Sequence, residues 1–133
     1  MRPPALALAA LFALACSSSP PTTTTFPDAP YVMTMSGDYH IELRTAPSQP
    51  PVRGAIDALL SVSDSSGVAS GRAIELTPWM PAMGHGSSTT PIVTPREAGD
   101  YLVTNLVLPM PGTWELRVTI DGAEQSVLSL DVQ

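Results

Sequence analysis

Apolar and polar residues alternate with a period of two in several segments of this chain, and no other feature constrains its fold as strongly. In the clearest segment, 114–120, apolar residues occupy every second position, and Glu, Arg and Thr lie between them. Further segments show the same pattern, the first three more clearly than the last three: 41–43, 56–62, 128–132, 72–77, 90–94 and 101–108. This alternation is typical of strands with one face on a core. The sequence therefore predicts a fold made of half-buried strands.

Short turn signals separate these segments. They combine Gly with Asp, Ser or Pro and lie at 36–38, 64–67, 98–100, 111–112 and 121–122. No window with helical periodicity and caps occurs after Cys16. The remaining residues, 31–133, are enough for one core and one domain. About seven short strands at roughly ten-residue spacing predict an all-β fold, an immunoglobulin-like β-sandwich of about seven antiparallel strands.

A short motif before one of these strands supports the sandwich. Glu97-Ala98-Gly99-Asp100-Tyr101 reads acid-x-Gly-x-Tyr. It resembles the corner of immunoglobulin-like domains in which a Tyr hydroxyl bonds back to upstream backbone. The alternative is that Tyr101 is only a core aromatic residue. Val103 stands where an antibody domain has a Cys, so no disulfide joins the two sheets.

The N-terminus has the pattern of an export signal. Arg2 precedes an almost wholly apolar run, 5–15, which ends at Cys16. A positive start and a short apolar run are the two parts of a secretory signal peptide. The run is shorter than the ~20 residues that a membrane-spanning helix needs. Residues 1–15 are therefore predicted to be a signal peptide, and the rest of the chain to be exported.

Cys16 is a candidate for lipid attachment. Ala13-Leu14-Ala15-Cys16 resembles the lipobox of bacterial lipoproteins, although Leu14 lies one position later than is usual. The resemblance implies that Cys16 is lipidated and becomes the N-terminus. The alternative is an ordinary signal peptide, with Cys16 removed or left as a free thiol, since the chain has no second Cys to pair with it.

The segment that follows predicts the layout of an anchored protein. Residues 16–30 consist mainly of Ser, Thr and Pro. Such a composition buries too little apolar surface to fold, and it predicts a disordered linker. An anchor, a linker and the domain 31–133 together predict a periplasmic protein of the bacterial cell envelope, held to a membrane by its lipid.

The net charge and the absence of several motifs narrow the classes of function that the chain can have. The formal net charge is −6, and the basic residues are single Arg residues that form no stripe, which disfavours nucleic acid as a partner. No G-x-S-x-G motif, phosphate loop or dinucleotide fingerprint occurs. No acidic residue lies between Glu75 and Glu97 to orient His85 as a catalytic base. We predict that the protein is not an enzyme, and we identify no small-molecule substrate.

Two loops rich in Met, Pro and Gly carry the candidate chemistry. They span 78–86 and 108–114 and contain Met80, Met83, His85 and Met110. Thioether and imidazole donors suit Cu(I), whereas Ca²⁺ and Mg²⁺ need carboxylates that these loops lack. Because thioethers do not titrate, His85 is the ligand that protonation would remove. The alternative is packing, in which Met fills gaps in the core beside Trp79 and Trp114.

The order of these motifs resembles the YtkA-like domain, which is related to the FixH proteins of copper-oxidase assembly. The matching residues are Met80-Pro81-x-Met83-x-His85, then acid-x-Gly-x-Tyr101, then Met110-Pro111-Gly112-x-Trp114, and the likeness extends over 38–133. It implies a compact β-sandwich in exported or lipid-anchored proteins concerned with copper or with oxidase maturation. In this family Met80, Met83, His85 and Met110 match motif positions. The Cys-x-x-x-Cys pair of thioredoxin-like copper chaperones is missing.

Two functions remain open from the sequence. The first is an accessory protein that binds Cu(I) through Met83, His85 and one or two of Met80 and Met110, and that serves a copper-handling or other envelope partner. The second is a metal-independent interaction module of the envelope, in which Met and Trp are apolar contacts. Met33 and Met35 are interpreted as residues of an edge strand that packs its Met side chains, so they are left outside the site.

Overall fold

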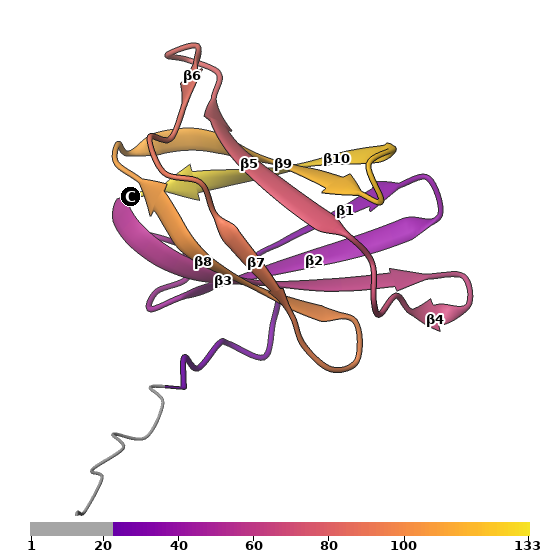
Figure 1. Ribbon diagram of the computed structural model, residues 1–133. Coiled ribbons are helices and arrows are strands. Elements are labelled where there is room, and N and C mark those ends of the chain that lie inside the picture. Colours follow the sequence, from indigo (N-terminus) through magenta and orange to yellow (C-terminus); the bar gives the residue numbers. More distant parts are fainter. Residues whose placement is uncertain (1–22) are drawn as a thin grey trace, which may run out of the picture.

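The computed structural model describes residues 23–133, without the side chain of Glu124. This part of the chain contains strands and no helix (Figure 1). The strands are β1 (Val32–Ser36), β2 (Tyr39–Ala46), β3 (Gly54–Asp64), β4 (Gly67–Val68), β5 (Ile74–Met80), β6 (His85–Gly86), β7 (Ile92–Pro95), β8 (Asp100–Leu108), β9 (Gly112–Ile120) and β10 (Glu124–Val132).

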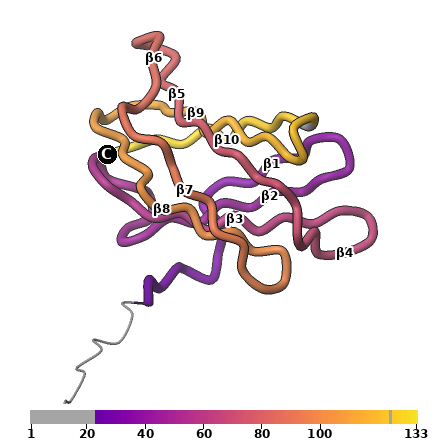
Figure 2. The backbone as a smooth tube through the Cα atoms, in the orientation of Figure 1, coloured from indigo at the N-terminus to yellow at the C-terminus, as the bar shows by residue number. Residues whose placement is uncertain are grey.

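The strands form two antiparallel sheets that pack face to face. The first sheet has six strands in the order β1-β2-β3-β8-β7, with β4 paired to β3, and the second has four in the order β10-β9-β5-β6. The backbone crosses between the sheets before β5, before β7 and again before β9 (Figure 2). The prediction of an all-β, immunoglobulin-like sandwich is confirmed.

The strand count exceeds the prediction for a simple reason. The seven predicted segments correspond to β2, β3, β5, β7, β8, β9 and β10. β1 is the edge strand expected at Met33 and Met35, and the additional strands, β4 and β6, have only two residues each. Strands this short show no alternation, and they exist because a neighbouring strand supplies their hydrogen bonds.

The core lies between the sheets and is built from alternate residues of the longer strands. In β9, Trp114, Leu116, Val118 and Ile120 are buried, and the residues between them are half-buried or exposed. Burying apolar area contributes about 25 cal/mol per Å², so this alternation drives the packing of the two sheets. All side chains of the buried cluster come from residues 41–132. A fragment of residues 23–133 therefore keeps the complete core.

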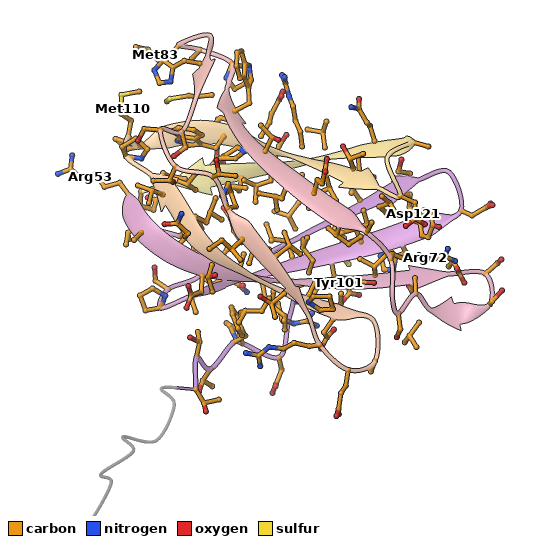
Figure 3. All side chains as sticks on the ribbon, in the orientation of Figure 1. Arg53, Arg72, Met83, Tyr101, Met110 and Asp121 are labelled. Carbon is orange, nitrogen blue, oxygen red and sulfur yellow. The ribbon has the colours of Figure 1, made fainter. Side chains whose placement is uncertain are left out.

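The acid-x-Gly-x-Tyr motif ties β8 to the segment between β4 and β5. The Tyr101 side chain is buried, and its hydroxyl donates to the carbonyl of Ala69 at 2.6 Å. The same oxygen accepts the backbone N–H of Arg72 at 3.0 Å (Figure 3). As predicted, the hydroxyl bonds to backbone upstream of Tyr101. Its partner lies about thirty residues away in the chain, however, and not in the same corner as Tyr101. Tyr101 thus closes one end of the sandwich.

Tyr101→Phe is expected to lower the free energy of unfolding by about 1–3 kcal/mol, because a buried carbonyl and a part-buried N–H lose their shared partner. Chemical denaturation of fragment 23–133 measures this change. Tyr31→Phe is the matched control: its hydroxyl makes a longer, exposed contact of 3.4 Å with the carbonyl of Asp131, and its loss should cost less than about 0.5 kcal/mol. Equal losses for the two variants would contradict the role given to Tyr101.

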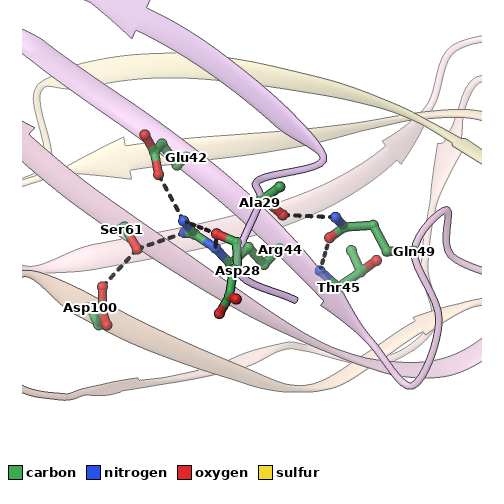
Figure 4. A network of polar contacts seen from close by, with 8 residues as sticks. All are labelled: Asp28, Ala29, Glu42, Arg44, Thr45, Gln49, Ser61 and Asp100. Carbon is green, nitrogen blue, oxygen red and sulfur yellow. Dashed lines mark hydrogen bonds and ion pairs between the residues drawn. The ribbon is translucent and has the colours of Figure 1, made fainter. Parts of the chain in front are cut away.

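The described part of the predicted linker, 23–30, has no helix or strand but is attached to the first sheet. Arg44 donates to the carbonyl of Asp28 through Nε at 3.1 Å and Nη2 at 3.0 Å (Figure 4). Gln49 Nε2 donates to the carbonyl of Ala29 at 2.9 Å. Composition does not predict these contacts, because the polar partners come from residues of the folded domain.

The predicted signal peptide, 1–15, and Cys16 lie outside the described residues. Between 23 and 133, no helix is long and apolar enough to cross a membrane. Residues 23–30 leave the sandwich on the lower side of Figure 1, and β6 projects at the top. Residues 23–30 and the predicted binding loop thus lie on opposite sides of the domain in this view.

Candidate functional site

A tight hairpin carries three of the four predicted ligands. The backbone N–H groups of Met83 and Gly84 donate to the carbonyl of Met80 at 3.2 Å and 3.0 Å, which folds the loop back on itself. Gly84 has a φ of 65°, a conformation that favours Gly. Met80 in β5 then pairs with His85 in β6. Residues paired in this way place their side chains on one face, with Cβ atoms about 4.5–5.5 Å apart.

Met80 is the inner member of this group. Only 6% of its surface is exposed, and it belongs to the buried cluster. Its Cε lies 3.0 Å from the position that a Cβ would occupy on Gly112, whose φ is 123°. Gly112 therefore leaves the space into which the Met80 methyl group packs. Met80 is therefore packed into the core at the base of the hairpin.

Met83 and His85 lie on the outside of the hairpin. The Met83 side chain is 56% exposed, and His85 is exposed as well. His85 Nδ1 lies 2.9 Å from the carbonyl oxygen of Gly86. A carbonyl only accepts, so this contact favours the tautomer with its hydrogen on Nδ1. Nε2 is then left with a free lone pair, which is the form of His that binds metals.

Met110 comes from the neighbouring loop between β8 and β9. Its side chain is half-buried and packs against the core. Trp114 Nε1–H donates to the Met110 carbonyl at 2.9 Å, which holds the loop in place. Because Gly112 of the same loop contacts Met80, the loop lies beside the hairpin. Met83 and Met110 are seen at the same end of the molecule in Figure 3.

The surroundings of the hairpin supply few charges. At its base, the Arg117 guanidinium lies 4.8 Å from the centre of the Trp79 ring, and Glu115 pairs with Arg117 at 3.0 Å. Among residues 23–133, no group of three or more His, Cys, Asp or Glu side chains is placed to hold a metal ion. A metal at this end would therefore depend on thioether donors together with His85.

The side chains of Met33 and Met35 do not pack as the sequence predicts. The edge position is correct, since β1 ends the first sheet. The predicted packing is wrong, because the two side chains are 59% and 68% exposed. The other residues of β1 are half-buried, and the register leaves both Met side chains on the outer face. The alternation Val-Met-Thr-Met-Ser does not reveal this, since Met suits either face.

Comparisons with known proteins agree with the resemblance seen in the sequence. The family model described as YtkA-like matches residues 34–119, a range that includes the hairpin and Met110. No curated protein matches the chain. Among solved structures, the crystal structure of the Lin-41 filamin domain is similar, with 15% identity over 68% of this chain and 91% of that chain and a TM-score of 0.47. The family match spans well over half of the sequence, and the chain belongs to the YtkA-like family.

Proposed function

We propose that this chain is an exported, lipid-anchored accessory protein of the bacterial cell envelope. It binds Cu(I) at the β5–β6 hairpin and serves copper handling or respiratory-oxidase assembly. One observation carries the proposal: His85, with its Nδ1 on the Gly86 carbonyl, is paired across the hairpin with Met80. The free nitrogen of an imidazole and a thioether therefore start from the same face of one rigid turn.

The donors suit Cu(I) and no hard cation. Thioether sulfur is soft and uncharged, and imidazole is intermediate, a combination that favours Cu(I) over Mg²⁺ or Ca²⁺. Met83 and His85 are the exposed donors, and Met110 is half-buried on the loop beside them. Met80 forms the inner wall, with its methyl group against Gly112. Residues 23–133 contain no Cys, so the site has no thiol to oxidise outside the cytoplasm.

Exposure of two donors fits an accessory role. Copper is the cargo here, and a partner must reach it to take it over. The hairpin that ends in β6 projects from the molecule on the side opposite residues 23–30 (Figure 1), and Met83 and His85 of this hairpin are exposed. A protein anchored through its N-terminus would then present the metal away from the anchor.

Competition with a chromogenic Cu(I) chelator tests the proposal on fragment 23–133 under reducing conditions. Met83→Leu combined with His85→Gln removes one sulfur and one nitrogen while keeping side chains of similar size. We expect the Cu(I) affinity of the hairpin to fall by about tenfold or more, with the free energy of unfolding unchanged within about 0.5 kcal/mol, since both residues are exposed. Ile92→Leu is the control on an exposed strand residue. Parent and double variant are both compared in a background of Met33→Leu with Met35→Leu, two exposed residues outside the hairpin, and unchanged competition by the double variant would refute the proposal.

A second function is favoured by the exposure of Met83 at the tip of the hairpin, whose strand β5 also carries the half-buried Trp79. In that case the hairpin docks an envelope partner through apolar contacts without metal. The same double variant separates the two functions, because Leu keeps the contact area and removes the donor. Partner capture that survives Met83→Leu with His85→Gln and needs no copper would favour docking.

A further inference from the structure

The outer face of β1 and β2 gathers a second set of soft donors. Met33 and Met35 are two residues apart on β1, so both side chains point to the same face. They are 59% and 68% exposed and are not among the residues of the buried cluster or those packed against it. An edge strand with two uncovered thioethers is therefore open to a ligand from solvent.

The sheet register brings a His to the same place. Met35 pairs directly with His40 of β2, and Met33 pairs with Glu42. In an antiparallel pair, opposite residues have Cβ atoms about 4.5–5.5 Å apart and diagonal ones about 7–8 Å apart. His40 therefore lies beside Met35 and diagonally across from Met33, on the face that both Met side chains share.

These separations fit one metal ion. A metal–sulfur bond is about 2.3 Å and a metal–nitrogen bond about 2.0–2.1 Å long. In Met, two further bonds join the sulfur to the Cβ. A bound metal can therefore lie roughly 4–5 Å from each Cβ. An ion above the triangle of Met33, Met35 and His40 is within reach of all three side chains, since Met has flexible torsions.

The scaffold under these side chains is held at both ends. The backbone N–H of Tyr31 donates to the carbonyl of Leu43 at 2.7 Å before β1 begins. At its other end, Ser36 Oγ donates to the carbonyl of Gln125 at 2.8 Å. A strand fixed in this way holds the spacing of its side chains, which is what a binding site requires.

The charge nearby is already paired. The Glu42 carboxylate accepts from Arg44 at 3.2 Å, which leaves the uncharged donors of Met33, Met35 and His40 as the open groups on this face. We propose that these three residues form a second soft-metal site, for a monovalent d¹⁰ cation such as Cu(I) or Ag(I). It shares no residue with the β5–β6 hairpin and stands on separate contacts, so it does not depend on the function proposed above.

Titration with Ag(I), which is redox-stable, tests this site in fragment 23–133 carrying ¹³C-methyl methionine. The starting variant combines Met83→Leu, His85→Gln and Met110→Leu, which disables the hairpin. We expect the Met33 and Met35 methyl signals to shift together and saturate with one Ag(I). The Met80 signal should stay in place. Single Met→Leu variants assign each signal, and both residues are exposed, so folding is not at risk.

Coupling between the residues distinguishes a shared ion from binding to single sulfurs. His40→Gln should weaken Ag(I) binding at both Met signals by tenfold or more, and Met35→Leu should weaken it at Met33. Val68→Leu, on an exposed residue of β4, should change neither. Methyl signals of Met33 and Met35 that do not shift, or that shift independently of His40, would overturn the proposal. In the parent fragment, the Met83 and Met110 signals report separately on the hairpin, so the two sites can fail independently.

Discussion

Trp114→Ala is expected to lower the free energy of unfolding by about 3–5 kcal/mol, the usual cost of removing a buried Trp side chain. Trp114 is 0% exposed and lies in β9, which is flanked by β10 and β5. Its removal opens a cavity between the sheets and leaves the Met110 carbonyl without its indole N–H. Denaturant unfolding of fragment 23–133 should show a lower midpoint with an unchanged slope.

Trp79→Ala is the matched control for this prediction. The Trp79 ring is only half-buried, and Arg117 covers it at 4.8 Å. A surface cation–π contact of this kind is worth about 0.5–1 kcal/mol, so its loss should cost far less than that of Trp114. A similar loss in both variants would contradict the assignment of Trp114 as the core residue of the pair.

Trp114→Phe separates packing from the hydrogen bond. Phe keeps most of the buried apolar surface but cannot donate to the Met110 carbonyl. We expect a loss of about 1–2 kcal/mol, together with weaker Cu(I) binding because the Met110 loop is no longer held. Cu(I) affinity that stays at the parent value would show that the 108–114 loop does not contribute to the hairpin site.

Gly99→Ala is expected to lower the free energy of unfolding by about 2–5 kcal/mol, from two causes. With a φ of 74°, Gly99 adopts a conformation that costs a side-chain-bearing residue about 1–2 kcal/mol. In addition, a Cβ would lie 2.6 Å from the carbonyl oxygen of Val62. This oxygen belongs to the backbone of β3 and cannot move freely, so overpacking adds about 1–3 kcal/mol.

Gly122→Ala isolates the steric part of this effect. Gly122 has nearly the same φ, 73°, but no atom lies within 4 Å of the position that a Cβ would occupy there. The Gly122 variant should therefore lose only the conformational cost, about 1–2 kcal/mol. Thermal or chemical unfolding measures both variants. If the two lose the same free energy, β3 does not approach Gly99 as closely as described.

Several features of the fold follow from the sequence alone. The alternation in 114–120 identifies the buried residues of β9, because a strand turns successive side chains to opposite faces whatever its neighbours are. The loop predicted at 78–86 is wrong in part, because Met80 belongs to β5 and His85 to β6, and the two residues pair across a tight turn. Acid-x-Gly-x-Tyr predicts a Tyr hydroxyl bonded to backbone. Its partners, on Ala69 and Arg72, come from a distant segment that no local pattern indicates.

The candidate site was only partly predictable. Its four residues were found from their soft donors, and the hairpin and the adjoining loop bring them to one end of the molecule. The sequence did not distinguish the buried Met80 from the exposed Met83. It also did not reveal that Met33 and Met35 are exposed, or that His40 faces Met35.

The alternation in the amino-acid sequence determined the all-β fold and which residues of the long strands enter the core. Tertiary structure alone decided what each Met does. A Met side chain is apolar enough for a core and is also a metal donor, so its burial depends on the strand that lies opposite. That pairing is set by contacts between segments far apart in the chain. Met80 is buried because Gly112 leaves room for its methyl group, and Met35 is exposed because it lies on the outer face of an edge strand.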